Sequence, residues 1–352
     1  MSKFIYPFSG GHSQSLATIS FLVCVILALC PGARSQSSDD VHIPPMRIRS
    51  TSDAPPKSDV ITGAEDRPSS DHDNRNVLRV KTDLVLVPVT VNDAMNHPVV
   101  NLGKQNFELF EAGKPQTISY FSTEDSPISV GVLLDLSYSM SNKIEIAREA
   151  LRQFFSNSNP DDDYFVLTFA DSPHLLADTT QSIDSLETKL ATATPKGSTA
   201  LLDAIYMGLS KLHSAKYSRR ALFIISDGGD NHSRYGSREI KKLVEEADVE
   251  IYAVGIFDAI FKTYEEWAGK RLLTNITETT GGRTIAVDDV RQLPDAAASI
   301  SRELRSHYVL GYRPLNLARD EQFRKIKVQL AVPPPATPLH LHFKKGYIGP
   351  GN

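Results

Sequence analysis

Oxygen-bearing side chains gather where one apolar stretch of the sequence ends. Residues 130–134 are apolar, and Asp135, Ser137 and Ser139 follow them at alternate positions. Carboxylate and hydroxyl oxygens are hard ligands that suit Mg²⁺ or Mn²⁺. Three such ligands from one turn can occupy one side of an octahedron and leave the other positions to water or a partner. The simpler interpretation is a helix N-terminus rich in capping residues, because short motifs of this kind often occur by chance.

Two later stretches carry further oxygen ligands in similar surroundings. Thr199 precedes a stretch whose Leu and Ile residues recur at helical spacing. Asp227 follows the apolar run 221–225, which is typical of a strand buried on both faces. Ligand sites of open α/β sheets lie beyond the carboxyl ends of the strands. Both residues therefore occur in the strand and loop contexts in which such sites are found.

Together these stretches resemble the von Willebrand factor type A (VWA) domain and its metal-ion-dependent adhesion site. That motif is D-x-S-x-S, followed by a Thr in a loop and by an Asp after a later strand. The matching residues are Asp135, Ser137, Ser139, Thr199 and Asp227. They occur in the order of the motif, and Tyr138 fills a position that varies. The resemblance implies one bound Mg²⁺ or Mn²⁺ ion.

The same resemblance implies how the ion would be held and used. Asp135, Ser137 and Ser139 would bind it from the first loop, whereas Asp227 would bind mostly through water. Thr199 would bind directly in the ligand-bound state. Because few carboxylates would touch the ion, it would stay electrophilic, and a Glu or Asp of a protein partner would complete its coordination. Thr199 could trade places with a water molecule as its loop shifts. This exchange would act as a switch only if the two positions of the loop differ in their affinity for the partner's carboxylate.

An alternation of strand and helix patterns over residues 126–306 must position these ligands. The expected strands are 129–136, 163–170, 220–226, 250–256 and 283–287. The expected helices are 143–156, 182–192, 199–213, 237–248, 265–280 and 292–306. This order predicts a Rossmann-like, doubly wound α/β domain with a mostly parallel sheet and helices on both faces. Residues 165–177 predict one antiparallel hairpin at the sheet edge.

Capping residues mark several of the expected helix ends. Asn142 and Glu145 have the spacing of a capping box at the start of the first helix. Ser237 is the expected cap of a later helix. Gly281 and Gly282 are expected to end the helix that precedes them.

Strand patterns flank the α/β region on both sides. In residues 79–125, the odd-numbered positions from 85 to 91 are all Val, which is typical of a half-buried strand. Residues 106–121 predict two strands joined by an Ala-Gly-Lys-Pro turn. Residues 307–352 hold three more strand patterns, at 308–312, 323–330 and 339–347. Each flank alone gives only a marginal sheet, so the two are expected to pair into one small β-sandwich-like domain.

The N-terminal part of the chain contains two further segments. Residues 1–35 predict a secretory signal peptide, with an apolar stretch from Leu16 to Cys30 and small residues before a cleavage point at Gln36. An uncleaved anchor is the alternative. Residues 36–78 are rich in Ser, Asp and Pro and contain no aromatic residue, which predicts a disordered linker.

Composition and charge narrow the class of protein. Hydrophobic residues make up 41% of the chain and charged residues 23%, as in ordinary globular proteins. Both cysteines lie in the signal segment, so the remaining chain has no disulfide framework. Cleavage would remove Lys3 and Arg34 and change the net charge from −4 to −6, which does not suggest a nucleic-acid partner. We expect a secreted or periplasmic protein without stable membrane insertion after signal cleavage.

The whole layout is similar to a family of secreted acidobacterial-type VWA-related proteins. Its members combine a signal peptide, a short β segment, the VWA domain and a β tail. The phrases that carry the resemblance are Phe107-Glu-Leu-Phe-Glu-Ala-Gly-Lys-Pro-Gln116, Tyr308-Val-Leu-Gly-Tyr-Arg313 and Lys345-Gly-Tyr347. The resemblance covers about residues 79–348 and implies no particular partner.

Other side chains could bind a metal but have simpler interpretations. Asp230 could support Asp227, although a solvated loop carboxylate is the simpler view. Residues 161–163 are all Asp, lie between a proline and a strand, and are expected to form a solvated turn. His340 and His342 share a strand face, but no Cys or carboxylate set accompanies them as a zinc site requires.

These observations favour a module that uses its own bound metal ion to recognise a partner protein. Such a module is not an enzyme. A metal with an open position can also activate water, so a metal-dependent hydrolase such as a phosphoesterase is the first alternative. A Ser137 nucleophile would need a base, and the sequence has no G-x-S-x-G motif. A structural envelope component with a purely structural metal is the second alternative. Turnover of generic phosphate or ester substrates with Mg²⁺ would favour the hydrolase.

Overall fold

The computed structural model describes residues 84–351, apart from 124, 181–182, 258–263 and 332–337. All described residues belong to one compact unit, residues 61–352. The predicted signal peptide (1–35) and linker (36–78) lie outside the described residues. No helix in the described part has both the length and the apolar character needed to cross a bilayer.

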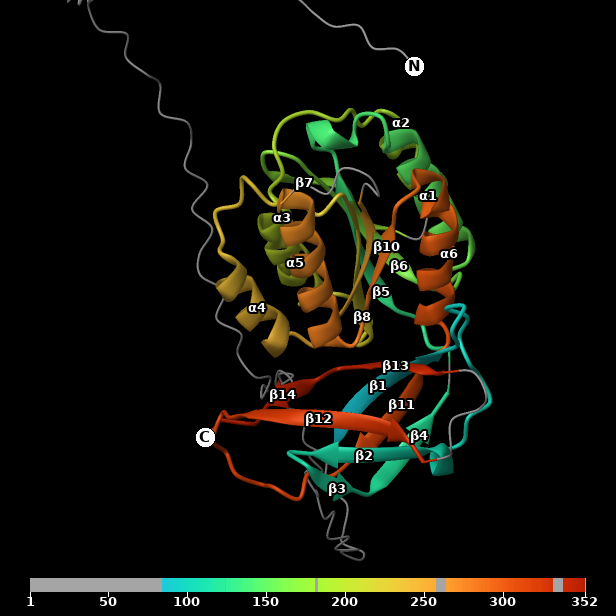
Figure 1. Cartoon of the computed structure of the whole chain (residues 1–352), viewed down its shortest axis with the longest axis vertical. Helices are drawn as coiled ribbons and strands as arrows, with labels where there is room; N and C mark the ends of the chain where they lie inside the picture. The colour runs from blue at the N-terminus through green and yellow to red at the C-terminus, as the bar shows by residue number, and fades with distance from the viewer. Residues whose placement is uncertain (1–83, 124, 181–182, 258–263, 332–337, 352) are drawn as a thin grey trace, which may run out of the picture. The chain divides into compact units, whose positions relative to one another are not determined.

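A six-stranded sheet forms the centre of the α/β region (Figure 1). Its strands are β5 (Ser129–Asp135), β6 (Asp163–Phe169), β7 (Pro173–Thr180), β8 (Arg220–Ser226), β9 (Glu250–Ile256) and β10 (Thr284–Val287). The strand order is β10-β9-β8-β5-β6-β7. All neighbours are parallel except β7, which pairs antiparallel with β6. The predicted mostly parallel sheet with one antiparallel edge hairpin is confirmed.

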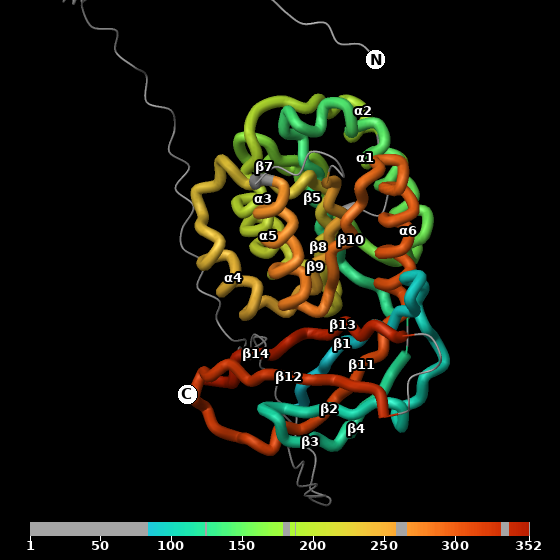
Figure 2. The backbone as a smooth tube through the Cα atoms, in the orientation of Figure 1, coloured from blue at the N-terminus to red at the C-terminus, as the bar shows by residue number. Residues whose placement is uncertain are grey.

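Helices cover both faces of this sheet, as the alternation of patterns predicts. They are α1 (Ile144–Ser156), α2 (Ile183–Ala191), α3 (Leu201–Leu212), α4 (Ser237–Glu246), α5 (Tyr264–Thr280) and α6 (Leu293–Leu304). Figures 1 and 2 show α1 and α6 on one face and α3, α4 and α5 on the other. Short 3₁₀ turns are η1 (Lys104–Asn106), η2 (Tyr138–Met140) and η3 (Val290–Gln292).

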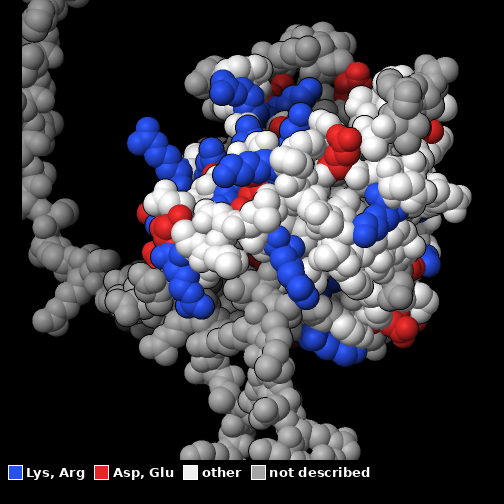
Figure 3. Space-filling model, turned by 90° about the horizontal axis from the view of Figure 1, so that it is seen from below, with Lys and Arg blue, Asp and Glu red and all other residues white. Residues whose placement is uncertain are grey.

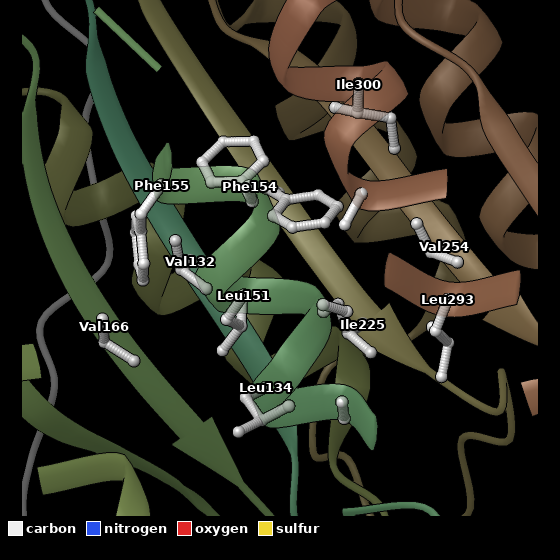
Figure 4. Packing of buried hydrophobic residues seen from close by; sticks show 14 of the residues in the cluster. Val132, Leu134, Leu151, Phe154, Phe155, Val166, Ile225, Val254, Leu293 and Ile300 are labelled. Atoms are coloured by element: carbon white, nitrogen blue, oxygen red, sulfur yellow. The ribbon is translucent and has the colours of Figure 1, made fainter. Parts of the chain in front are cut away.

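The core on the α1 and α6 side fixes the central strands. Every residue of β5 is buried, because helices cover both of its faces, and its sequence is therefore an apolar run rather than an alternation. Phe154 of α1 stacks on Phe223 of β8 with ring centroids 4.4 Å apart. Ile300 of α6 packs in the same cluster (Figure 4). Burial of each such side chain contributes about 1.5–3 kcal/mol, which holds the carboxyl ends of β5 and β8 in place.

The two flanks of the α/β region combine into a pair of four-stranded sheets. The N-terminal flank supplies β1 (Val85–Asn92), β2 (Phe107–Glu111), β3 (Lys114–Gln116) and β4 (Ile118–Ser122), and the C-terminal flank supplies β11 (Tyr308–Tyr312), β12 (Phe323–Leu330), β13 (His340–Phe343) and β14 (Gly346–Ile348). One sheet has the order β13-β1-β11-β4 and the other β14-β12-β2-β3. Each sheet thus contains strands of both flanks, and the predicted fold class, α/β with an added β-sandwich-like part, is confirmed.

The Val face of β1 forms one wall of the sandwich core. Val87, Val89 and Val91 are fully buried, as the alternating pattern predicts. They share one hydrophobic cluster with Leu109 of β2 and Val328 of β12, from the opposite sheet. Alternate residues of β12, among them its lysines, are exposed. Viewed from below, this end of the molecule presents more basic than acidic side chains (Figure 3), although the chain as a whole is acidic.

The predicted hairpin over residues 106–121 is wrong in its second half. The turn consists of Ala112 and Gly113, which have φ angles of 48° and 80°, as a tight two-residue hairpin requires. The return strand then divides. β3 pairs with β2, whereas β4 joins β11 in the other sheet. Gln116 and Ile118, on either side of this division, are both buried.

Two predicted caps are also wrong. Helix α1 begins at Ile144 after Lys143, and no side chain caps it. The chain enters α1 from the η2 turn with helical backbone angles, so Asn142 cannot act as an extended N-cap residue. Ser237 is the first residue of α4, whereas the extended cap residue is Gly236, whose N–H donates to the Glu239 carboxylate at 2.8 Å.

Buried polar contacts join the α/β region to the sandwich. The Arg283 Nε of the α/β region donates to Glu303 Oε2 of α6 at 2.7 Å, and the Asn92 amide of β1 donates to the same oxygen at 3.0 Å. Arg219 donates to the carbonyls of Ser126 and Leu304, at 2.7 and 2.8 Å. One guanidinium therefore fastens both the segment that enters the α/β region and the segment that leaves it.

The interleaved strands predict how a truncated chain behaves. A chain that ends at Ser306 lacks β11 to β14, and β1 then has neither of its neighbours. We expect proteases to degrade it up to about residue 126, while residues 126–306 stay folded, because the six-stranded sheet is complete without the flanks. Limited proteolysis with mass spectrometry, alongside the full chain, measures this. Protection of residues 84–123 in the truncated chain would contradict the division into an inserted and a discontinuous domain.

Candidate metal centre

The central sheet brings two of the predicted ligands to one edge. Asp135 is the last residue of β5, and Asp227 directly follows β8. The two strands are parallel neighbours, with Leu134 opposite Ile225, so their carboxyl ends lie side by side. The charge of Asp227 raises the pKa of Asp135, which shows that the two carboxylates are within electrostatic reach of each other.

Asp135 is a fully buried carboxylate held by two donors. Its Oδ1 accepts the N–H of Ser137 at 2.8 Å, and its Oδ2 accepts the hydroxyl of Ser226 at 2.6 Å. Burial and then the charge of Asp227 raise its pKa to about 6, although the hydrogen bonds from Ser137 and Ser226 act in the opposite direction. A cation next to both carboxylates would relieve this strain, so the electrostatics favour cation binding.

The hydroxyls of Ser137 and Ser139 lie next to each other beside this carboxylate. Their Oγ atoms are 3.0 Å apart. Tyr138 between them is 76% exposed, and its N–H donates to the Gly197 carbonyl at 3.0 Å. That backbone hydrogen bond ties the serine turn to the loop that carries Thr199.

Thr199 lies in a loop whose backbone is held from two sides. Its N–H donates to the Asn231 side chain at 2.9 Å, and its carbonyl accepts the N–H groups of Asn231 and His232 at 3.0 Å. The preceding residue, Ser198, donates its N–H to Asp171 at 2.7 Å, and this hydrogen bond lowers the pKa of Asp171. A shift of Thr199 therefore has to move residues 231–232 as well.

A close contact between two glycines fixes the Asp227 loop. Gly228 has a φ angle of 85°, and its N–H donates to Ser226 Oγ at 3.0 Å. Gly269 of α5 packs directly on it, and a Cβ atom at Gly269 would lie only 1.9 Å from the Gly228 carbonyl oxygen. On its other side, Asp227 Oδ2 accepts the Lys143 ammonium at 3.0 Å.

Ser226, Asn231 and Lys143 belong to this arrangement but were not predicted from the sequence. Ser226 could have been found, because it directly precedes a predicted ligand at the end of a strand. Asn231 reaches Thr199 across 32 sequence positions, and Lys143 reaches Asp227 across 84. No local pattern indicates contacts over such separations.

The donor set fits a hard divalent cation. It offers only oxygen atoms, from two carboxylates and neutral hydroxyls, as Mg²⁺ and Mn²⁺ prefer. Burial and the charge of Asp227 raise the pKa of Asp135, and a cation beside both carboxylates would act in the opposite direction. His340 and His342 lie elsewhere, on β13. Within the described residues, no cluster of three or more His, Cys, Asp or Glu side chains occurs, so that pair lacks the further ligands of a zinc site.

The remaining acidic candidates have structural roles. Asp230 Oδ1 accepts the Ser233 hydroxyl at 2.5 Å and the Leu202 N–H at 3.2 Å, and so caps the start of α3. The expected solvated turn at 161–163 is wrong for its last two residues, because Asp162 and Asp163 are buried. They accept hydrogen bonds from Ile128 N–H and the Ser129 hydroxyl, at 2.9 and 2.5 Å, where β5 begins.

The raised pKa of Asp135 predicts how pH affects the stability of the metal-free protein. The folded-state pKa of about 6 exceeds the ordinary aspartate value of 3.8, so the folded state binds the proton more tightly than the unfolded state. In EDTA, wild-type stability should fall by roughly 2.5 kcal/mol relative to Asp135→Asn as the pH rises from 4 to 7. Urea denaturation across this range measures the difference. A constant difference between the two proteins would contradict the raised pKa.

Solved structures with similar folds come from several bacteria. An aerotolerance-related membrane protein from Bacteroides fragilis is 19% identical, with 50% of this chain and 98% of that chain covered at a TM-score of 0.42. BatB from Bacteroides thetaiotaomicron is 20% identical, with 51% and 100% covered at a TM-score of 0.40. A von Willebrand factor type A protein from Catenulispora acidiphila is 11% identical, with 76% and 74% covered at a TM-score of 0.44.

The sequence itself matches one known domain family. Residues 130–229 match the von Willebrand factor type A domain. The comparison with curated proteins gives no match. The adhesion-site metal and the narrower resemblance to secreted acidobacterial-type proteins stay predictions. The matched residues, which include β6, β8, the 137–139 turn and all of β5 except Ser129, are similar to the von Willebrand factor type A domain.

Proposed function

We propose that this protein binds one Mg²⁺ or Mn²⁺ ion at the ends of β5 and β8 and uses it to recognise an acidic residue of a protein partner. The observation that carries the proposal is the buried Asp135 carboxylate, which lies within electrostatic reach of Asp227 and beside two serine hydroxyls. Asp135, Ser137, Ser139, Thr199 and Asp227 would hold the ion. The bound ion supplies an electrophilic position for a carboxylate oxygen.

The ligand types favour an electrophilic ion. Ser137, Ser139 and Thr199 are neutral donors and Asp227 would bind mostly through water, so Asp135 would be the protein's main direct carboxylate ligand. Thr199 sits in a loop that is hydrogen-bonded to residues 231–232. If Thr199 moved toward or away from the ion, the coordination of the ion would change, and so would the protein surface around it.

An exposed aromatic side chain lies at the site and suits a protein partner. Tyr138 lies between the two serine ligands and is 76% exposed. Tyr and Trp are enriched among residues that dominate binding energy at protein interfaces. The proposal is therefore a binding module rather than an enzyme, and the signal-peptide pattern of residues 1–35 supports a role outside the cytoplasm.

The first test concerns the metal. Mg²⁺ that binds the native state should raise the melting temperature of the wild-type protein relative to EDTA, by mass action. Asp135→Ala should stay folded and lose this response, whereas Asp178→Ala should keep it. Asp178 is an exposed carboxylate that pairs with Lys211 and lies outside the site. Differential scanning fluorimetry with and without Mg²⁺ measures all three proteins. An equal Mg²⁺ response in wild type and Asp135→Ala would refute the assignment.

The second test concerns the partner. Proteins captured from secreted or envelope extracts in Mg²⁺ should be released by EDTA, because the partner carboxylate would bind through the ion. Thr199→Ala should weaken partner binding about tenfold and Mg²⁺ binding much less, whereas Thr188→Ala, at an exposed position of α2, should change neither. Surface plasmon resonance with the identified partner gives the two affinities. Partner binding that EDTA does not affect would exclude the adhesion-type mechanism.

A further inference from the structure

A lysine ammonium lies against one of the proposed metal ligands. Lys143 Nζ is 3.0 Å from Asp227 Oδ2, and the side chains are 24% and 11% exposed. The contact crosses from the residue before α1 to the loop after β8, so it connects two of the three loops that would hold the ion. Within the described part of the chain, no second Lys or Arg side chain contacts either Asp135 or Asp227.

The backbone of Lys143 is fixed, whereas its ammonium is carried on a flexible stem. Its N–H donates to the Met140 carbonyl at 2.9 Å, and its carbonyl accepts the Ala147 N–H at 3.0 Å in the first turn of α1. The lysine ammonium sits at the end of a flexible four-carbon stem. The ammonium can therefore leave Asp227 without any change in the loop or helix that carries it.

The charges at the site explain why such a cation is present. Asp135 and Asp227 together bring two negative charges to one edge of the sheet, and the repulsion contributes to the raised pKa of Asp135. Lys143 supplies one positive charge. A divalent ion would supply two, and Lys143 would then repel it at short range.

We propose that Lys143 is a displaceable internal counter-ion, which neutralises Asp227 in the metal-free protein and leaves it when a divalent ion enters. This inference rests on the proposed metal site. Lys143 thereby lowers the affinity for the ion and keeps the empty site folded. The entering ion therefore displaces the Lys143 ammonium from Asp227, and not water alone.

The first measurement is the Mg²⁺ affinity of Lys143→Met, which keeps the length of the stem and removes the charge. We expect its Kd for Mg²⁺, from isothermal titration calorimetry on the full chain, to fall about tenfold or more below that of wild type. Lys211→Met is the matched control, because Lys211 is similarly exposed and also pairs with an aspartate, Asp178, outside the site. Its Kd should stay within about twofold of wild type.

The second measurement follows the ammonium directly. Brief acetylation of the wild-type protein, with mass spectrometry of each lysine, should label Lys143 slowly in EDTA and several-fold faster in Mg²⁺. The labelling of Lys211 should not respond to Mg²⁺. This readout separates displacement from a lysine that stays on Asp227 and merely repels the ion from there.

The outcomes separate this inference from the proposed function. If wild type binds Mg²⁺ but Lys143→Met binds equally or more weakly, Lys143 positions Asp227 for the metal, and the counter-ion role is wrong. If affinity rises but Lys143 labelling does not respond to Mg²⁺, displacement is wrong. Binding by Lys143→Met alone would support the inference, because Lys143 would then outcompete the ion. If neither protein binds Mg²⁺ or Mn²⁺, the metal site fails and the inference with it.

Discussion

The hydrogen bond from the Ser226 hydroxyl to Asp135, at 2.6 Å, joins the ends of β8 and β5, and the rest of the site depends on it. The same hydroxyl accepts the N–H of Gly228 and so sets the path of the Asp227 loop. It also supports a buried carboxylate that is otherwise costly to ionise. Asp135 stays buried at the end of β5, where Phe154, Phe223 and their neighbours pack against the central strands.

Most of the α/β region could be predicted from the sequence, because its signals are local. Apolar runs such as 130–134 mark strands that are buried on both faces, and helical periodicity marks the segments that cover them. The candidate ligands Asp135 and Asp227 could be placed for the same reason, since each ends such a run. The Val positions of β1 likewise indicated which of its faces is buried.

Features that depend on distant contacts could not be predicted. Asn142 has the composition of a cap, but the η2 turn delivers the chain to α1 in a helical conformation and leaves no extended cap position. Asp162 and Asp163 look like solvated loop residues until β5 presents them with hydrogen-bond donors. The Lys143 contact and the division of the hairpin return into β3 and β4 follow from packing between segments far apart in sequence.

The interleaving of the flanks also has a consequence for biosynthesis. Val85 pairs with Tyr312 and Val89 with Phe343, so the first strands of the sandwich are closed by the last. On a ribosome, β1 and β2 emerge early and wait without partners until the C-terminal strands exist, whereas the α/β region can fold in the meantime and bring the flanks together. A nascent chain that stops early keeps bare strand edges, which chaperones and proteases recognise. The sandwich can therefore close only after the strands of the C-terminal flank have been synthesised.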